Sequence, residues 1–222
     1  FDLEHFNAIT KGGLSRKSLN VILAGTGVGK TLAMCHFAAA NLVQGKNVLY
    51  ITMEMAEERI AERIDSNLLD VPINELPDFP KKIYEQKIDK LRAKTKGHLI
   101  IKEYPTASVH SGHFRHLLSE LKVKKKFKPD IIYVDYLNIC GSSRLKNNIT
   151  NSYMYVKSIA EELRGLAVET NLPIVTATQV NRSGFTNSDP GLEDTSESFG
   201  LPATADFMFA MITNEALDDL GQ

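Results

Sequence analysis

Short apolar segments alternate with longer stretches of helical periodicity along most of the chain. The apolar segments are rich in Val, Ile, Leu and Tyr, as in the run Ile131-Ile132-Tyr133-Val134, which has no polar position. Such runs are typical of strands that are covered by helices on both faces. The pattern predicts six strands, over residues 20–24, 47–53, 98–103, 131–135, 173–178 and 206–212.

The stretches between these strands carry the apolar spacing and the end signals of helices. The first long helix starts at Lys30, directly after a glycine-rich turn, and Gly45 is a natural stop signal for it. We expect helices over residues 30–44, 56–69, 81–95, 112–125 and 152–170. The alternation predicts an α/β fold, with a mostly parallel central sheet and helices on both faces. We expect residues 1–222 to form a single domain.

Three segments show neither pattern and are predicted to be loops. Residues 70–80 contain three prolines, residues 141–151 are rich in Ser, Asn and basic side chains, and residues 181–202 are rich in Gly, Ser and Asp. The last two follow predicted strands directly. Ligands of open α/β sheets bind at the carboxyl ends of the strands, so we expect these two loops to share a face with the glycine-rich turn.

Composition limits the compartment and the partners. The chain is 43% hydrophobic and 24% charged with a formal net charge of −1, so contacts with nucleic acid would need local basic loops. Its two cysteines lack metal spacing and favour a reducing interior. No apolar run approaches the roughly 20 residues of a membrane span, and no secretory pattern opens the chain. We expect a soluble cytoplasmic protein with no membrane partner. Because the chain starts at Phe1 instead of Met, we also expect a fragment that lacks an N-terminal domain and a C-terminal end.

The glycine-rich turn carries the strongest chemical signal. Between a strand and a helix, its pattern predicts a loop whose backbone N–H groups surround phosphate oxygens. Lys30 would reach the β- and γ-phosphates of ATP or another NTP, and the Thr31 hydroxyl would bind Mg²⁺. Ala24 departs from the usual pattern, which begins with glycine. The predicted nucleotide-binding residues here are Gly25, Thr26, Gly27, Val28, Gly29, Lys30 and Thr31.

Three polar residues end predicted strands on the same face. Asp135 is a candidate for holding Mg²⁺, although an acidic strand end can simply face solvent. Glu54 is a candidate for orienting or deprotonating the attacking water, although it could instead cap a helix, a role that Glu57 and Glu58 suit better. Gln179 could sense the γ-phosphate through its amide, or be an ordinary polar strand end.

Three segments around these residues carry a family resemblance. Thr52-Met53-Glu54-Met55, Ile132-Tyr133-Val134-Asp135-Tyr136-Leu137 and Thr178-Gln179-Val180-Asn181-Arg182-Ser183 follow the order and context of DnaB-type hexameric replicative helicases, including those of T-even-like bacteriophages. The resemblance covers nearly the whole chain, and Ala24 is ordinary in that family. It implies a RecA-like motor domain in a bacterial cell or a phage-infected bacterial host.

The resemblance also implies roles for individual residues. Lys30 and Thr31 would bind phosphate and Mg²⁺, Glu54 would be the catalytic base, Asp135 would support Mg²⁺, and Gln179 would couple nucleotide state to the DNA loops. Arg63 matches an arginine near the nucleotide in relatives. The family implies a homo-hexamer with primase and a helicase loader as partners. It also implies an arginine finger from the neighbouring subunit, which we expect beyond residue 222.

Two loops are candidates for contact with single-stranded DNA in the channel of such a ring. Cationic and amide side chains there can hold a phosphate backbone without reading bases. Without the family resemblance, the same residues would be taken for solvated loop positions. The candidate residues are Arg144, Lys146, Asn147, Asn148, Asn181 and Arg182.

Three functions are compatible with these motifs. The first is an ATP-dependent 5′-to-3′ replicative DNA helicase, with the polarity implied by the resemblance alone. The second is a RecA-type recombinase that forms filaments on DNA, and the third is a non-enzymatic module that binds nucleotide as an assembly switch. The run Gln179-Val180-Asn181-Arg182 favours the helicase over the recombinase, and the presence of both Lys30 and Glu54 argues against a non-enzymatic module.

Two further patterns have simpler interpretations. Three histidines recur at every third position, but no fourth ligand accompanies them at metal-binding spacing, so we expect a solvated helix start. Five lysines follow at the end of the same predicted helix, where cations complement the helix dipole. The histidines are His110, His113 and His116, and the lysines are Lys122, Lys124, Lys125, Lys126 and Lys128.

Overall fold

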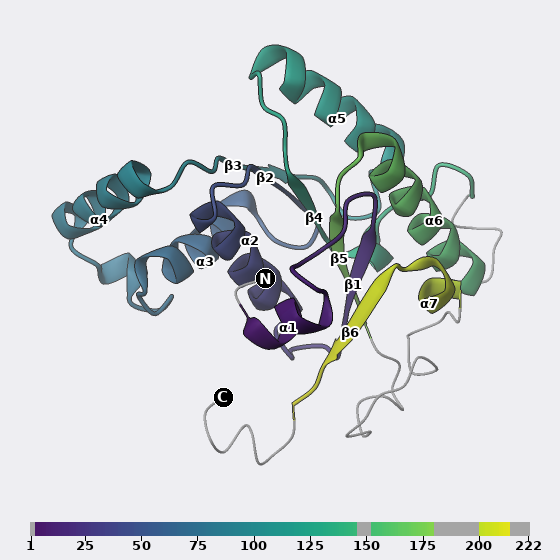
Figure 1. Ribbon diagram of the computed structural model, residues 1–222, viewed down its shortest axis with the longest axis horizontal. Helices are drawn as coiled ribbons and strands as arrows, with labels where there is room; N and C mark the ends of the chain where they lie inside the picture. Colours follow the sequence, from purple (N-terminus) through teal and green to yellow (C-terminus); the bar gives the residue numbers. More distant parts are fainter. Residues whose placement is uncertain (1–2, 146–151, 180–199, 214–222) are drawn as a thin grey trace.

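A six-stranded parallel sheet organises the protein (Figure 1). The structure is a computed structural model that describes residues 3–145, 152–179 and 200–213. The strands lie in the order β3-β2-β4-β5-β1-β6, and every neighbouring pair is parallel. Each strand begins and ends within one residue of its prediction, which confirms the mostly parallel sheet. The strands are β1 (Leu19–Ala24), β2 (Val48–Thr52), β3 (Leu99–Glu103), β4 (Ile131–Asp135), β5 (Ile174–Gln179) and β6 (Phe207–Met211).

The five predicted helices are confirmed, and two short helices were not predicted. The predicted ones are α2 (Lys30–Val43), α3 (Glu57–Leu69), α4 (Lys81–Lys94), α5 (Ser111–Lys124) and α6 (Ser152–Thr170). The other two are α1 (Glu4–Ile9) and α7 (Gly200–Thr204), and short 3₁₀ turns occur at Leu76–Asp78 and Leu137–Ile139. Helix α7 begins inside the segment 181–202 that was predicted to be a loop, so that prediction was wrong at its end. A helix this short has too few positions to show a 3.6-residue period.

Two hydrophobic layers pack against the two faces of the sheet. Helices α5 and α6 cover one face, while α2 and α3 cover the other, as the two sides of Figure 1 show. Successive residues of a strand point to opposite faces of the sheet, so Val21 packs in the layer of α6 and its neighbour Ile22 packs in the layer of α2. Among the described residues, none of the helices combines the length and the apolar character needed to cross a membrane.

Strand register brings the predicted site residues to one edge of the sheet. Thr52 is paired with Asp135 across β2 and β4, and Ala24 is paired with Gln179 across β1 and β5. The carboxyl ends are therefore level within each pair, and all four strands end at the same edge of the sheet. Because Glu54 follows β2 closely, its backbone reaches the same edge.

The histidines of α5 form a helix cap. The His110 ring accepts a hydrogen bond from the Gly112 N–H at 3.1 Å, and the His113 ring accepts one from the His110 N–H at 3.2 Å. These bonds satisfy N–H groups that would otherwise lack partners in the first turn. No group of three potential metal-ligating side chains occurs within the described residues. At the other end of α5, Lys122 and Lys124 lie in the last turn, as expected for cations that complement the helix dipole.

Candidate functional site

The glycine-rich loop forms an open turn between β1 and α2. Gly27 and Gly29 have φ values of +81° and +104°, which a side chain rarely tolerates. A Cβ atom added at Gly27 would meet no atom of the described chain within 4 Å, so the space beside the turn is free for a ligand. The loop leads directly into the N-terminus of α2 at Lys30. Its backbone N–H groups and the helix dipole therefore favour an anion at this position.

Lys30 lies largely buried beside this loop. Its side chain is 8% exposed, and its Nζ donates a hydrogen bond to the Gly25 carbonyl at 3.1 Å. Burial lowers the pKa of Lys30, while the carboxylates of Glu54 and Asp135 act in the opposite direction. The ammonium group therefore lies beside the glycine loop within the electrostatic influence of two carboxylates, where a phosphate group could bind it.

Asp135 is fully buried at the end of β4. Its Oδ2 accepts a hydrogen bond from the Tyr50 hydroxyl at 3.0 Å, whereas its Oδ1 has no hydrogen-bond partner among the described residues. Burial raises the pKa of Asp135, whereas the Thr31 and Tyr50 hydroxyls lower it. The Thr31 hydroxyl lies near the carboxylate but does not form a hydrogen bond with Oδ1. The alternative of a solvent-facing strand end is therefore wrong.

The unpaired oxygen of Asp135 fits a site for a hard cation. An unpaired buried polar atom costs about 1–3 kcal/mol, so it calls for an explanation. Mg²⁺ binds through carboxylate oxygens and phosphates, and the neighbouring Thr31 hydroxyl can supply a further oxygen. The residues present thus match the donor set that Mg²⁺ needs.

Glu54 and Arg63 approach this centre from β2 and α3. Glu54 is exposed, and its charge acts on the pKa values of Lys30, Asp135 and Tyr136 in addition to the larger effect of burial. It does not cap α3, because Ala56 occupies the N-cap position and the Glu54 carboxylate accepts no hydrogen bond from an α3 N–H group among the described residues. Arg63 is half-buried, and after the effects of burial and hydrogen bonding its charge lowers the pKa of Asp135.

Tyr136 links Lys30 to Gln179, a role that its position in the sequence did not predict. Its ring lies under the Lys30 ammonium, 5.8 Å from Nζ to the ring centroid. Its hydroxyl accepts a hydrogen bond from Gln179 Nε2 at 3.1 Å. Burial raises the pKa of Tyr136, with smaller contributions from Glu54 and Asp135, so the hydroxyl stays protonated. An aromatic residue directly after the aspartate was the available signal.

Of the six residues predicted to contact DNA, Arg144 lies within the described part of the chain. Arg144 follows the 3₁₀ turn Leu137–Ile139, is 58% exposed, and pairs with Glu161 at 3.1 Å between Nη1 and Oε2. The structure does not bring Arg144 into contact with the glycine loop. The other five candidates lie outside the described residues, namely Lys146, Asn147, Asn148, Asn181 and Arg182.

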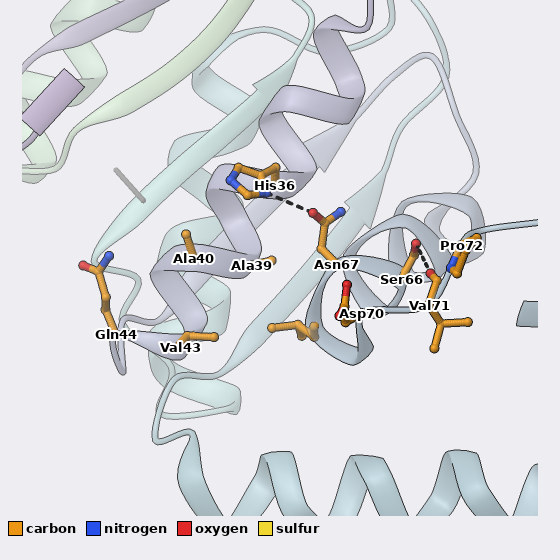
Figure 2. Close-up of a pocket in the computed structure, with 11 residues that line it drawn as sticks. His36, Ala39, Ala40, Val43, Gln44, Ser66, Asn67, Asp70, Val71 and Pro72 are labelled. Atoms are coloured by element: carbon orange, nitrogen blue, oxygen red, sulfur yellow. Dashed lines mark hydrogen bonds between the residues drawn. The ribbon is translucent and has the colours of Figure 1, made fainter. Parts of the chain in front are cut away.

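Two of the hollows that α2 lines differ in whether they touch the site. Figure 2 shows a hollow of 570 Å³ between the later part of α2 and the end of α3, where His36 and Asn67 are joined by a 3.0 Å hydrogen bond. None of the predicted site residues lines it. A second hollow of 450 Å³ begins at Val28 and Gly29 of the glycine loop. Its other walls are mainly apolar and include Leu32, Phe37, Phe209 and Met211.

Comparison with known proteins agrees with this geometry. The chain is 52% identical over 220 residues to the DnaB-like replicative helicase of Enterobacteria phage T4, and 28% identical over 201 residues to the replicative DNA helicase DnaB of Helicobacter pylori strain 26695. These matches cover 98% and 88% of this chain. The chain spans only 46% and 40% of the lengths of these two relatives.

Solved structures agree on the fold. A DnaB-like replicative helicase, described with its interactions with primase, has a TM-score of 0.79 at 18% identity, covering 98% of this chain and 52% of that chain. A second solved structure, described as an ATPase domain, has a TM-score of 0.77 at 18% identity, covering 96% of this chain and 76% of that one. These neighbours share the RecA-like architecture expected from the sequence. The DnaB-like helicase C-terminal domain family matches residues 2–220, which include the whole site, so this chain belongs to that family.

Proposed function

We propose that this chain is the ATP-driven motor domain of a replicative DNA helicase. The proposed motor translocates on single-stranded DNA, 5′ to 3′ as the family implies, and unwinds duplex DNA at the replication fork. The observation that carries the proposal is that a buried lysine, Lys30, and a buried carboxylate oxygen without a partner, on Asp135, occur together with an open glycine loop. This combination occurs in a chain of the DnaB-like family. We infer the cytoplasm of a bacterial cell or a phage-infected bacterial host as its setting.

The phosphates of ATP or another NTP would bind between the glycine loop and Lys30. The N–H groups of residues 25–31 would surround the β-phosphate, and Lys30 would exchange its bond to the Gly25 carbonyl for phosphate oxygens. Mg²⁺ would be held by Thr31 and Asp135, and when bound it would neutralise charge on the phosphates. The mainly apolar hollow that begins at Val28 would accept the nucleoside.

Three polar side chains would act on the γ-phosphate end of the nucleotide. Glu54 is exposed and free of a capping role, so it can orient or deprotonate the attacking water. Arg63 would add positive charge from α3. Gln179 would report the state of the γ-phosphate to the segment that follows β5, because it is the last residue of that strand.

Replacing Tyr136 with phenylalanine tests this coupling. The variant keeps the ring under Lys30 but loses the hydroxyl that Gln179 contacts. One net hydrogen bond contributes roughly 1 kcal/mol, so we expect DNA stimulation of the ATPase to fall about fivefold while nucleotide affinity is unchanged. ATPase rates measured with and without single-stranded DNA, together with nucleotide titrations, check this.

Tyr84→Phe is the matched control. The Tyr84 hydroxyl also takes part in one hydrogen bond, which it donates to Asp65 at 2.7 Å, but that bond joins α4 to α3 outside the site. Its removal should leave DNA stimulation intact. Equal stimulation in Tyr136→Phe and in the wild type would show that the hydroxyl does not couple the two ends of the site.

Family membership supports a proposal for DNA contact and assembly. We propose that Arg144, Lys146, Asn147, Asn148, Asn181 and Arg182 face the channel of a homo-hexameric ring and contact the phosphate backbone of single-stranded DNA. ATP would lie between subunits, with an arginine of the neighbouring subunit completing the site. Primase and a helicase loader are the proposed protein partners.

Three measurements separate this function from the two alternatives. A helicase motor should show ATPase activity stimulated by single-stranded DNA, strand displacement on a forked duplex, and rings in the electron microscope. A recombinase should instead form filaments, and a non-enzymatic module should bind nucleotide without turnover. The protein should be tested at its natural full length. An ATPase indifferent to DNA, with no rings, would rule out the helicase.

A further inference from the structure

The carboxylate of Glu162, in the middle of α6, is buried among hydroxyl and backbone N–H groups. The side chain is 6% exposed. Its oxygens accept hydrogen bonds from the Ser142 hydroxyl at 2.6 Å, the Ser143 N–H at 2.9 Å and the Ser143 hydroxyl at 2.8 Å. The Ser111 hydroxyl, in the first turn of α5, donates a fourth bond at 2.9 Å. A buried carboxylate is tolerated only when its oxygens are satisfied in this way.

These bonds outweigh the cost of burial. Burial alone raises the pKa of Glu162, but the bonds from Ser142, Ser143 and Ser111 bring it below the ordinary value. The group is therefore a carboxylate at neutral pH. Its environment is built for an anion that accepts hydrogen bonds, without a cation as partner among these contacts.

The segment of residues 142–145, which Glu162 contacts, lies outside the helices and strands. Its N–H groups therefore depend on side chains. The Ser142 N–H donates to the Tyr155 hydroxyl at 3.2 Å, and the N–H groups of Arg144 and Leu145 donate to the Ser142 hydroxyl at 3.1 Å each. That hydroxyl is itself bonded to Glu162, so the carboxylate is the centre of the whole arrangement.

Arg144 projects from this held segment. Its backbone is fixed through Ser142 and Glu162, while its side chain is exposed and pairs with Glu161. Two adjacent carboxylates on α6 thus contact different parts of Arg144, Glu162 its backbone N–H and Glu161 its guanidinium group. Glu162 fixes the place from which the side chain leaves the backbone, and Glu161 competes with any anion that the guanidinium could bind.

We propose that Glu162 is a positioning residue for DNA binding, which fixes segment 142–145 against α6 so that Arg144 meets the DNA backbone at a defined place. This inference rests on the proposed function of the chain as a DNA-translocating motor. Glu162 touches neither nucleotide nor DNA in this scheme, and it acts through the loop alone.

The test compares Glu162→Gln with Glu161→Gln. Each variant removes one negative charge from adjacent positions of α6, so general electrostatics would tighten DNA binding in both. A positioning role predicts opposite signs. Glu161→Gln should bind DNA as tightly as the wild type or more tightly, because it releases Arg144. Glu162→Gln presents an amide N–H₂ to groups that donate, so its dissociation constant for single-stranded DNA should rise about tenfold.

Binding is measured with a fluorescent single-stranded oligonucleotide, alongside steady-state ATPase. The DNA concentration for half-maximal stimulation should rise in Glu162→Gln, while the rate at saturating DNA stays near that of the wild type. Ser143→Ala removes a single hydroxyl bond at an exposed residue and should shift DNA binding in the same direction by less. It keeps the inference testable if Glu162→Gln folds poorly.

Hydrogen exchange tests the anchoring without DNA. Backbone N–H groups of residues 143–145 should exchange faster in Glu162→Gln than in Glu161→Gln, at similar melting temperatures. Unchanged exchange, or DNA binding that tightens equally in both glutamine variants, would overturn the inference. If the wild type ignores DNA, the proposed function fails and DNA positioning fails with it, whereas faster exchange would still establish the anchor.

Discussion

Lys30→Ala should reduce the ATPase rate by about 100- to 1,000-fold, the usual cost of removing one group that stabilises charge in a transition state. The ammonium group lies beside the glycine loop, where the charges of Glu54 and Asp135 act on it and the Gly25 carbonyl is its hydrogen-bond partner. Alanine leaves no cation at this position to meet the β- and γ-phosphates. Steady-state ATPase at saturating nucleotide, with and without single-stranded DNA, measures the loss.

The fold should survive this substitution. Burial lowers the pKa of Lys30, which means that the native state favours the neutral amine more than the unfolded chain does. The charged amine therefore does not stabilise the folded protein at neutral pH, and its removal should leave the melting temperature unchanged or slightly higher. Retained stability would separate a chemical defect from unfolding.

Lys46→Ala is the matched control, because Lys46 is an exposed lysine just past the end of α2. It should keep full ATPase activity. DNA binding should persist in Lys30→Ala, since the proposed DNA contacts lie in other segments. Near-normal turnover in Lys30→Ala would remove the phosphate loop from the proposed mechanism.

The fold was predictable because its signals are local. Apolar runs such as Ile131-Ile132-Tyr133-Val134 predicted strands with helices on both faces of the sheet. Gly45 follows α2 with a φ of +78°, as expected for a glycine that ends a helix. Helices α1 and α7 were missed because a segment of five or six residues shows no clear period. Their positions depend on tertiary contacts, such as that of Phe6 in α1 with Phe209 in β6, whose ring centroids are 4.7 Å apart.

The site was predictable only where a motif lies within one segment. Lys30 and Thr31 follow from the glycine pattern alone, whereas Tyr50 and Tyr136 depend on the strand order. That order places β4 between β2 and β5, so the Tyr50 hydroxyl meets Asp135 and Gln179 meets Tyr136. The motifs lie within single segments, and none of them specifies which strands are neighbours in the sheet.

The hydrogen-bond network of Glu162 was also not predictable from the sequence. Its hydrogen-bond partners lie 18 to 51 residues away, from Arg144 to Ser111. On the sequence it is simply one of two adjacent glutamates on a helix, and only packing distinguishes it from the half-buried Glu161. Buried polar networks of this kind require the tertiary structure to be recognised.

Asp135→Asn should separate activity from stability. The variant keeps the shape of the side chain and an acceptor for the Tyr50 hydroxyl, but it loses the charge that would hold Mg²⁺. We expect the ATPase rate to fall by at least about 100-fold, because charge stabilisation at the phosphates is lost. The rate should not recover at high Mg²⁺ concentration if Asp135 supports the ion directly.

The same variant should be more stable than the wild type in the absence of nucleotide. The folded-state pKa of Asp135 is raised above its ordinary value of 3.8, chiefly by burial. The native state therefore binds this proton more tightly than the unfolded chain does. Stability from this group is present below pH 3.8 and is lost as the pH rises through the folded-state pKa. At neutral pH the buried charge destabilises the protein, and asparagine removes that cost.

Thermal melts across this pH range check the sign. The gain in melting temperature of Asp135→Asn over the wild type should be small at the acid end and should grow as the pH rises through the folded-state pKa. Adding nucleotide with Mg²⁺ should raise the melting temperature of the wild type more than that of the variant, because a ligand that binds the native state stabilises it. Asp130→Asn is the matched control, because Asp130 directly precedes β4 and the asparagine keeps an acceptor for the Asn47 N–H. This variant should behave as the wild type in ATPase assays. An Asp135→Asn protein that is less stable at neutral pH, or that retains Mg²⁺-dependent turnover, would show that the buried carboxylate serves the fold and not the metal.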